Sequence, residues 1–249
     1  NANCGHGFEW DMCIGGNAFL SSAYLVRGDG PILESDDPYY GIDGSYIGGL
    51  TPVGYVTGAR LFLNDMDVIK QAIYDHGSLY TTLHVADPAS GESLDEYMNE
   101  DFTYYYDVGE PGNHAVTLVG WDDSKYVSRA PNLGAWICKN SWGDSWGEDG
   151  YFYISYDDSK VNGEVAYWPE RKAQYNTVIY QYDELGMTGY FGWLDNYTDY
   201  ALVKFEIEND EKINSIGTWV PSGNATVQIE IYDGFNGTTP FDLLGVIEE

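Results

Sequence analysis

Two short segments near the start of the chain carry apolar residues at helical spacing. The first follows Asn17, a residue type that caps helices, and stops at Gly28. The second follows Asn64 as its cap, has acidic residues in its first turn and stops at Gly77. The sequence therefore predicts two helices. Their apolar positions are Phe19, Leu20, Ala23, Tyr24 and Val26 in the first, and Val68, Ile69, Ala72 and Ile73 in the second.

Strand patterns follow the two helices. They are rich in β-branched and aromatic residues and are separated by clusters of Gly, Pro, Asp or Ser. Helices followed by strands favour an α+β fold with few helices. Between the first two strands, the acidic and Tyr-rich segment 87–111 predicts a mobile flap. The four predicted strands are 79–85, 115–121, 135–139 and 151–155.

The last third of the chain shows strand patterns without helical spacing, which indicates a separate all-β domain. Pro and charged residues interrupt the apolar pattern near residues 168–173, so we expect domains at 1–172 and 173–249. The pattern ends before enough strands have accumulated to close two sheets, and we therefore expect an incomplete β-sandwich. Its predicted strands are 178–183, 201–207, 213–220 and 225–232.

Composition narrows the possible partners. The 249 residues are 43% hydrophobic and 16% aromatic, which is typical of a globular protein. With 11 basic and 40 acidic residues, the net charge is −29, and this opposes binding to nucleic acids or anionic membranes. No apolar run approaches the ~20 residues that a membrane span needs.

Metal and cofactor sites are not indicated. Cys4, His6 and Cys13 lack paired metal-ligand spacing, and the acidic clusters lack a calcium-loop pattern. We expect ordinary structural roles for His6, His76 and His84. The three cysteines are an odd number, so at most one internal disulfide can form.

A histidine and an asparagine stand where a sheet could bring them together. His114 opens the strand pattern 115–121, and Asn140 follows the strand pattern 135–139. A histidine held by an amide makes up two of the three parts of a nucleophilic triad. A lone histidine in a sheet is more often structural, so this interpretation depends on the residues around the pair.

Those residues resemble the papain-like cysteine peptidases. Residues 113–121 read NHAVTLVGW and residues 136–152 read WICKNSWGDSWGEDGYF, which are similar to the family's His and Asn motifs. CIGGN at 13–17 and GPILESDDPY at 30–39 resemble two further segments of the family. The resemblance covers residues 4 to about 167 and implies a peptidase that acts on protein or peptide substrates. It also allows a Cys4–Cys13 disulfide, although either cysteine could instead bridge to another part of the protein.

After residue 175, the chain resembles the lectin-like β-sandwich that follows the peptidase in some bacterial and archaeal surface members of the family. Segments 178–183 and 212–232 carry this weaker match. The combination implies an exported prokaryotic protein, either extracellular or at the cell surface.

The resemblance assigns roles to individual residues. His114 would take the proton of a thiol and later donate it to the leaving amine, Asn140 would orient the imidazole, and Trp142 would shield their hydrogen bond from water. Gly15 and Gly16 would pair with an extended substrate, and their other reading is a turn in a disulfide loop. The predicted substrate-binding residues are Gly15, Gly16, Asn17, Ala18 and Asn113, with Asn17 and Ala18 flanking the pocket for the second residue before the cleaved bond.

The nucleophile of the family lies in a CGxCWAF stretch at the start of a long helix, preceded by a Gln, and neither occurs in this sequence. We therefore expect a preceding segment that carries the catalytic cysteine, and no catalysis by this chain alone. Cys138 is the candidate within the chain, because it lies two residues before Asn140 on the same strand face. A buried strand thiol is inert, which argues against it.

The sequence therefore predicts a cysteine-type endopeptidase in which this chain supplies the histidine base and the orienting asparagine. The alternative is a non-catalytic surface adhesion or binding protein on a decayed peptidase scaffold, with the sandwich as the binding part. The residue at the nucleophile position distinguishes the two hypotheses.

Overall fold

The chain divides into two compact units, Asn1–Gly186 and Met187–Glu249, each considered by itself. The computed structural model describes residues 15–38, 49–62, 64–172, 178–182, 200–207, 209–220 and 225–248. The predicted boundary between residues 172 and 173 stays a prediction, because 173–177 and 183–199 lie outside these ranges. The motif cysteine Cys13 and residue 39 of the GPILESDDPY segment also lie outside them.

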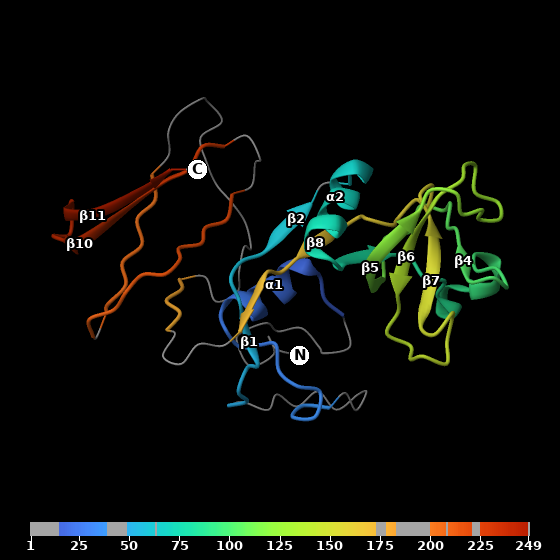
Figure 1. Cartoon of the computed structure of the whole chain (residues 1–249), viewed down its shortest axis with the longest axis horizontal. Helices are drawn as coiled ribbons and strands as arrows, with labels where there is room; N and C mark the ends of the chain where they lie inside the picture. Colours follow the sequence, from blue (N-terminus) through green and yellow to red (C-terminus); the bar gives the residue numbers. More distant parts are fainter. Residues whose placement is uncertain are drawn as a thin grey trace. The chain divides into compact units, whose positions relative to one another are not determined.

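A mixed sheet of seven strands forms the centre of the first unit. Its strand order is β2-β8-β3-β5-β6-β7-β4, so β5, β6 and β7 lie side by side (Figure 1). All pairs are antiparallel except β4 with β7. The strands are β2 (Arg60–Phe62), β3 (Leu79–Leu83), β4 (Thr103–Tyr104), β5 (His114–Asp122), β6 (Ala135–Lys139), β7 (Tyr151–Ser155) and β8 (Val165–Tyr167), and a separate pair is made of β1 (Gly54–Val56) and β9 (Glu170–Lys172).

Two α-helices occur in the described residues, where the apolar spacing predicts them. In α1 (Ala18–Val26), the Asn17 side chain accepts a hydrogen bond from the third helical N–H, as a cap does. In α2 (Met66–His76), the cap is Asp65 and the prediction of Asn64 is wrong by one residue. The Asp65 carboxylate accepts from two first-turn N–H groups, and its charge also suits the positive helix end.

The core lies between α2 and the middle of the sheet. The helix packs on β3 and β5, and β3 buries every second residue, as a half-buried strand does. Together with the strands at 135–139 and 151–155, this confirms the α+β prediction. The buried core residues of these elements are Ile69, Ala72, Ile73, Leu79, Leu83, Val116, Leu118, Trp136, Cys138, Phe152 and Ile154.

Segment 87–111 differs from its prediction as a flap. It contains the 3-10 helices η2 (Pro88–Ser90) and η3 (Leu94–Glu96) and the edge strand β4. Tyr104 and Tyr106 in this segment are fully buried, and both belong to the core. Their rings contribute large apolar areas, and burial of those areas outweighs the polarity of the neighbouring acidic residues. The segment is therefore a packed part of the sheet domain.

The second unit contains one antiparallel hairpin among its described residues, β10 (Gln228–Phe235) with β11 (Pro240–Glu248). Strand β10 overlaps the predicted strand 225–232, whereas the sequence pattern does not predict β11. The described parts of the other three predicted segments, 178–182, 201–207 and 213–220, form no strand. A strand requires a hydrogen-bonded neighbour, and an alternating pattern alone does not supply one.

Candidate active site

His114 and Asn140 meet on one face of the sheet. His114 is the first residue of β5, and Asn140 directly follows β6. The register pairs Thr117 with Lys139, so continuing it by one residue sets Val116 opposite Asn140. His114 lies two residues before Val116 and is therefore a diagonal neighbour of Asn140 on the same face. The antiparallel register explains how two residues far apart in sequence come together.

A hydrogen bond of 2.8 Å joins His114 Nε2 to Asn140 Oδ1. The same Oδ1 accepts from the backbone N–H of Ser141 at 2.8 Å. A backbone N–H can only donate, so this contact identifies the Asn140 atom as the amide oxygen. Nε2 of His114 must then carry the proton, and the neutral ring keeps its lone pair on Nδ1. The arrangement leaves Nδ1 as the nitrogen that can exchange a proton with another group.

Trp142 lies beside this pair. Its ring centroid is 5.2 Å from that of His114 with a 37° angle between the planes, and it packs edge-on against Trp146 at 4.8 Å. Trp146 in turn packs against the core residue Phe152. Trp142 is 41% exposed, so it covers the His114 ring on one side and contacts solvent on the other.

Some of the predicted substrate-binding residues line a pocket of about 520 Å³, which is also lined by the segment that leads to His114. Gly16 and Asn17 line it together with Pro111 and Gly112, which precede His114 by three and two residues. Other lining residues include Thr82, Ser159, Lys160, Val161 and Glu164.

The two glycines expose their backbone. Both are exposed, and a Cβ built on either would meet no atom of the described residues within 4 Å. Gly15 has φ of 88°, in the left-handed region that favours glycine. Among the residues that the structure describes, no side chain would therefore block an extended chain from approaching here.

Ala18 and Asn113 are placed differently. Ala18 is 0% exposed and donates its backbone N–H to Glu164 at 3.1 Å, so it does not reach the pocket surface. The side chain of Asn113 bonds the backbone N–H and C=O of Val85, at 2.7 and 2.8 Å. This pair of bonds continues the β3–β5 pairing beyond the end of β3, and it occupies the Asn113 amide.

Cys138 is completely buried and free. Burial, with a smaller contribution from the charge of Asp158, raises the pKa of the thiol far above its usual range. A thiol that stays protonated is a poor nucleophile. The Cys138 side chain therefore packs as an ordinary residue of the hydrophobic core.

Among the residues that the structure describes, no group of three His, Cys, Asp or Glu side chains could hold a metal ion. None of the helices in these same ranges has the length and apolar character needed to cross a membrane.

A buried polar cluster around His84 is the feature that the sequence did not reveal. His84 directly follows β3, and its ring nitrogens contact Pro111 and Glu92. The signal in the sequence is weak: a histidine directly after an apolar alternating strand, with an acidic residue eight positions later.

Comparison with known proteins adds two family matches. Residues 2–168 match the model described as papain family cysteine protease, and residues 179–246 match the model described as lectin like domain. Both matches agree with the resemblance in the sequence.

Related proteins agree with the papain-family match. The chain is 31% identical over 154 residues to cysteine proteinase 3 of Entamoeba histolytica, covering 61% of this chain and 46% of that protein. It is 31% identical over 144 residues to cysteine proteinase 15A of Pisum sativum, covering 57% of this chain and 38% of that protein. The chain thus spans less than half the length of these relatives.

A similar solved structure contains the cysteine protease and lectin-like domains of Cwp84, described as a surface layer associated protein of Clostridium difficile. It has 28% sequence identity and a TM-score of 0.55, covering 64% of this chain and 37% of that one. A second structure, of Cwp84 after propeptide cleavage, has 27% identity and a TM-score of 0.60, covering 69% and 45%.

Proposed function

This chain belongs to the papain family of cysteine proteases, and on that premise we propose that it is part of a cysteine endopeptidase that hydrolyses peptide bonds. The observation that carries the proposal is the hydrogen bond of 2.8 Å between His114 and Asn140. The two residues stand in the family's motif order, and the geometry leaves Nδ1 of the ring available for proton transfer.

His114 is the proposed acid and base. Its Nδ1 takes the proton of a thiol, and the imidazolium that results lowers the pKa of that thiol. The Nε2–H bond to Asn140 keeps the ring oriented in both protonation states, and Trp142 limits the access of water to that bond. The amide oxygen of Asn140 also stabilises the positively charged ring, because it accepts a hydrogen bond from the ring N–H.

The reaction proceeds in two steps. The thiolate attacks the peptide carbonyl carbon, the C–N bond breaks, and the His114 imidazolium gives its proton to the leaving nitrogen. A thioester joins the enzyme to the acyl part of the substrate. His114 then takes a proton from water, whose oxygen attacks the thioester carbonyl, and the C–S bond breaks to release the carboxylic acid. This step restores the starting state, in which the thiol is ionised and the His114 ring carries the proton.

The described residues place no suitable thiol beside His114, and because the family's CGxCWAF stretch does not occur in the sequence, we assign the nucleophile to a segment outside these 249 residues. Cys138 is unsuited to the role, since it is fully buried and its pKa is raised. The protein or peptide substrate lies along Gly15 and Gly16 by backbone pairing, and a side chain of the substrate enters the pocket that Gly16 shares with Gly112.

The direct test compares the full-length protein with its His114→Ala variant on unfolded casein. We expect kcat to fall by about 10²- to 10⁴-fold, the usual contribution of a general acid and base. A thiol-alkylating reagent should abolish the wild-type activity. Undiminished hydrolysis by the variant would show that His114 is not the base.

The alternative is a surface adhesion or binding protein, and the lectin-like match at residues 179–246 is the observation that favours it. The codons before Asn1 in the gene separate the two functions. A Gln followed by a CGxCW-like stretch supports the peptidase. Ser, Gly or Ala in place of that Cys moves the function to the second unit.

We also propose that the protein acts outside the cell or at the cell surface. The support is its similarity to Cwp84, which is described as a surface layer associated protein. Protease treatment of intact cells of the source organism should remove the protein if it is exposed there. Survival of the protein in intact cells, with loss after lysis, would contradict this location.

A further inference from the structure

Three consecutive residues, the last of β3 and the two that follow it, are bonded to the segment that leads into the proposed base. The Leu83 carbonyl accepts from the backbone N–H of Asn113 at 3.0 Å. Both backbone groups of Val85 bond the Asn113 side chain. Between these contacts, Nδ1 of His84 lies 2.8 Å from the Pro111 carbonyl oxygen. His84, which directly follows β3, is thus the side chain that holds the start of this segment.

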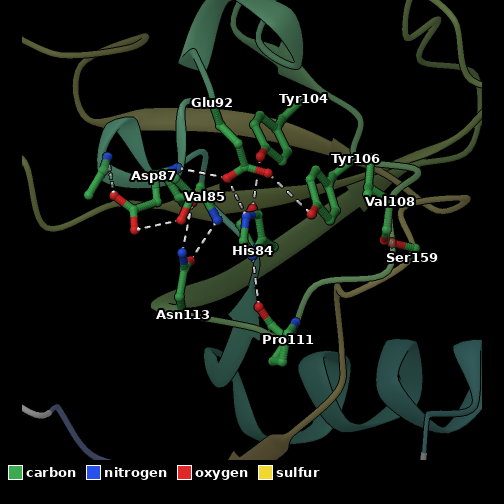
Figure 2. Close-up of polar contacts among 12 residues, drawn as sticks. His84, Val85, Asp87, Glu92, Tyr104, Tyr106, Val108, Pro111, Asn113 and Ser159 are labelled. Carbon is green, nitrogen blue, oxygen red and sulfur yellow. Dashed lines mark hydrogen bonds and ion pairs between the residues drawn. The ribbon is translucent and has the colours of Figure 1, made fainter.

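His84 is itself held from the opposite side. Its Nε2 lies 2.9 Å from Oε2 of Glu92, and the two side chains are 6% and 16% exposed. The Tyr106 ring stacks on the imidazole at 4.3 Å, and the Tyr104 hydroxyl donates to the His84 carbonyl at 2.8 Å. Figure 2 shows the ring between Glu92 on one side and Pro111 on the other.

These contacts require a doubly protonated ring. The Pro111 carbonyl can only accept a hydrogen bond. Oε2 of Glu92 also accepts from the backbone N–H of Asp87 at 2.9 Å, as an ionised carboxylate does. A neutral imidazole has a single N–H and can satisfy one of the two acceptors. His84 therefore makes both bonds as an imidazolium.

The charges around His84 favour this form. Burial disfavours the charged ring, but the hydrogen bonds to Glu92 and Pro111 outweigh it and raise the pKa of His84 above its ordinary value of 6.5. Because the pKa is raised in the folded protein, both bonds are present below pH 6.5, and one of them is lost as the pH rises through the folded pKa. The titratable groups that face the ring from neighbouring elements are Glu92, Tyr104, Tyr106, Glu110 and Asp158.

We propose that His84 is a positioning residue of the peptidase: paired with Glu92 as an imidazolium, it holds Pro111 and so fixes the segment that carries His114. Loss of one proton from His84 sets an unprotonated nitrogen against an oxygen of Glu92 or Pro111, and this weakens the hold of His84 on the segment. Pro111 and Gly112 also line the pocket, so the same contact shapes its wall. This inference rests on the proposed function, because the residue positioned is the proposed base.

The first measurement is a pH titration by NMR of the full-length protein with ¹⁵N-labelled histidines. We expect both ring nitrogens of His84 to carry protons up to a pKa above about 6.5, and Glu92→Gln to lower that pKa. The Nε2–H signal of His114 should be sharp below the pKa of His84 and broaden above it. His76→Gln is the control, since it removes a histidine that stacks on Tyr167 outside this network.

The second measurement is the pH profile of kcat/KM. In Glu92→Gln, the alkaline limb should move to lower pH by the same interval as the NMR pKa of His84. His84→Gln should lower kcat/KM about tenfold at about pH 6, the usual effect of losing a hydrogen bond to a charged group. That difference should shrink as the pH rises past the pKa of His84. A general loss of folding would lower kcat/KM equally at every pH.

The outcomes separate the two proposals. Absence of hydrolysis by the full-length wild type contradicts the proposed function, whatever His84 does. The positioning role is contradicted if His84 titrates below 6.5, or if the His114 Nε2–H signal and the alkaline limb do not respond to Glu92→Gln. The NMR readout needs no turnover, so it tests the positioning role even if no substrate is cleaved.

Discussion

His114 and Asn140 are 26 residues apart in the chain, and a hydrogen bond of 2.8 Å joins the ring of one to the amide oxygen of the other. The antiparallel pairing of β5 with β6 brings them together, and Ser141 fixes which atom of the amide faces the ring. The hydrogen bond orients the His114 ring, and the paired strands that carry both residues are a rigid support for a proton-transfer group.

Removal of the orienting amide should weaken catalysis without abolishing it. Asn140→Ala leaves His114 free to rotate, and a hydrogen bond of this kind contributes about 0.5–1.5 kcal/mol. We expect kcat to fall about twofold to tenfold while KM changes little. Steady-state kinetics on a fluorogenic peptide measure this effect, and Asn132→Ala, on an exposed loop, is the matched control. An equal fall in the control would show that the loss is not specific to the site.

Trp142 should support catalysis by shielding the His114–Asn140 hydrogen bond from water. Trp142→Ala exposes that bond to water, where hydrogen bonds are weaker, and we expect kcat to fall several-fold. The free energy of unfolding should fall by about 1 kcal/mol, because the contact with Trp146 is lost. Trp142→Phe keeps a ring in place and should retain most of the activity. Full activity of the alanine variant would exclude a shielding role.

Cys138 should be dispensable for catalysis. Its thiol is fully buried, so a thiol reagent such as Ellman's reagent should reach it only after unfolding. Cys138→Ala should keep hydrolysis unchanged and lower the free energy of unfolding by about 1 kcal/mol through a small cavity. Urea unfolding and peptide kinetics on the full-length protein check both effects. Loss of hydrolysis in a folded variant would make Cys138 the nucleophile.

The half-buried Tyr80 should make the stability of the protein sensitive to alkali. Burial, with the charge of Glu164, raises the pKa of Tyr80 to about 12. The unfolded chain ionises near pH 10 while the folded Tyr80 stays neutral, so its contribution is complete below pH 10 and is lost between about pH 10 and 12. We expect Tyr80→Phe to reduce this loss by about 1 to 2 kcal/mol. Urea unfolding at about pH 9 and about pH 11.5 measures the difference. The same loss in both proteins would contradict it.

Local features of the fold could be predicted from the sequence because they depend on neighbouring residues. The cap at Asn17 and the strands 135–139 and 151–155 follow from residue type and spacing. The cap of α2 could not be decided, since Asn64 and Asp65 are both good caps and the backbone conformation selects between them. A strand pattern such as 201–207 also does not indicate which other strand would pair with it.

The sequence by itself determined the two halves of the candidate site. The segments around His114 and Asn140 carry the family's residues in order, and a sheet is the expected way to join them. Only the tertiary structure decided which nitrogen of His114 bonds Asn140, that Ala18 is buried, and that the Tyr-rich segment 87–111 is core. It also decided that His84 bonds Glu92 and Pro111. The physical reason is that burial and protonation depend on groups distant in the chain, which come together only when the sheet forms.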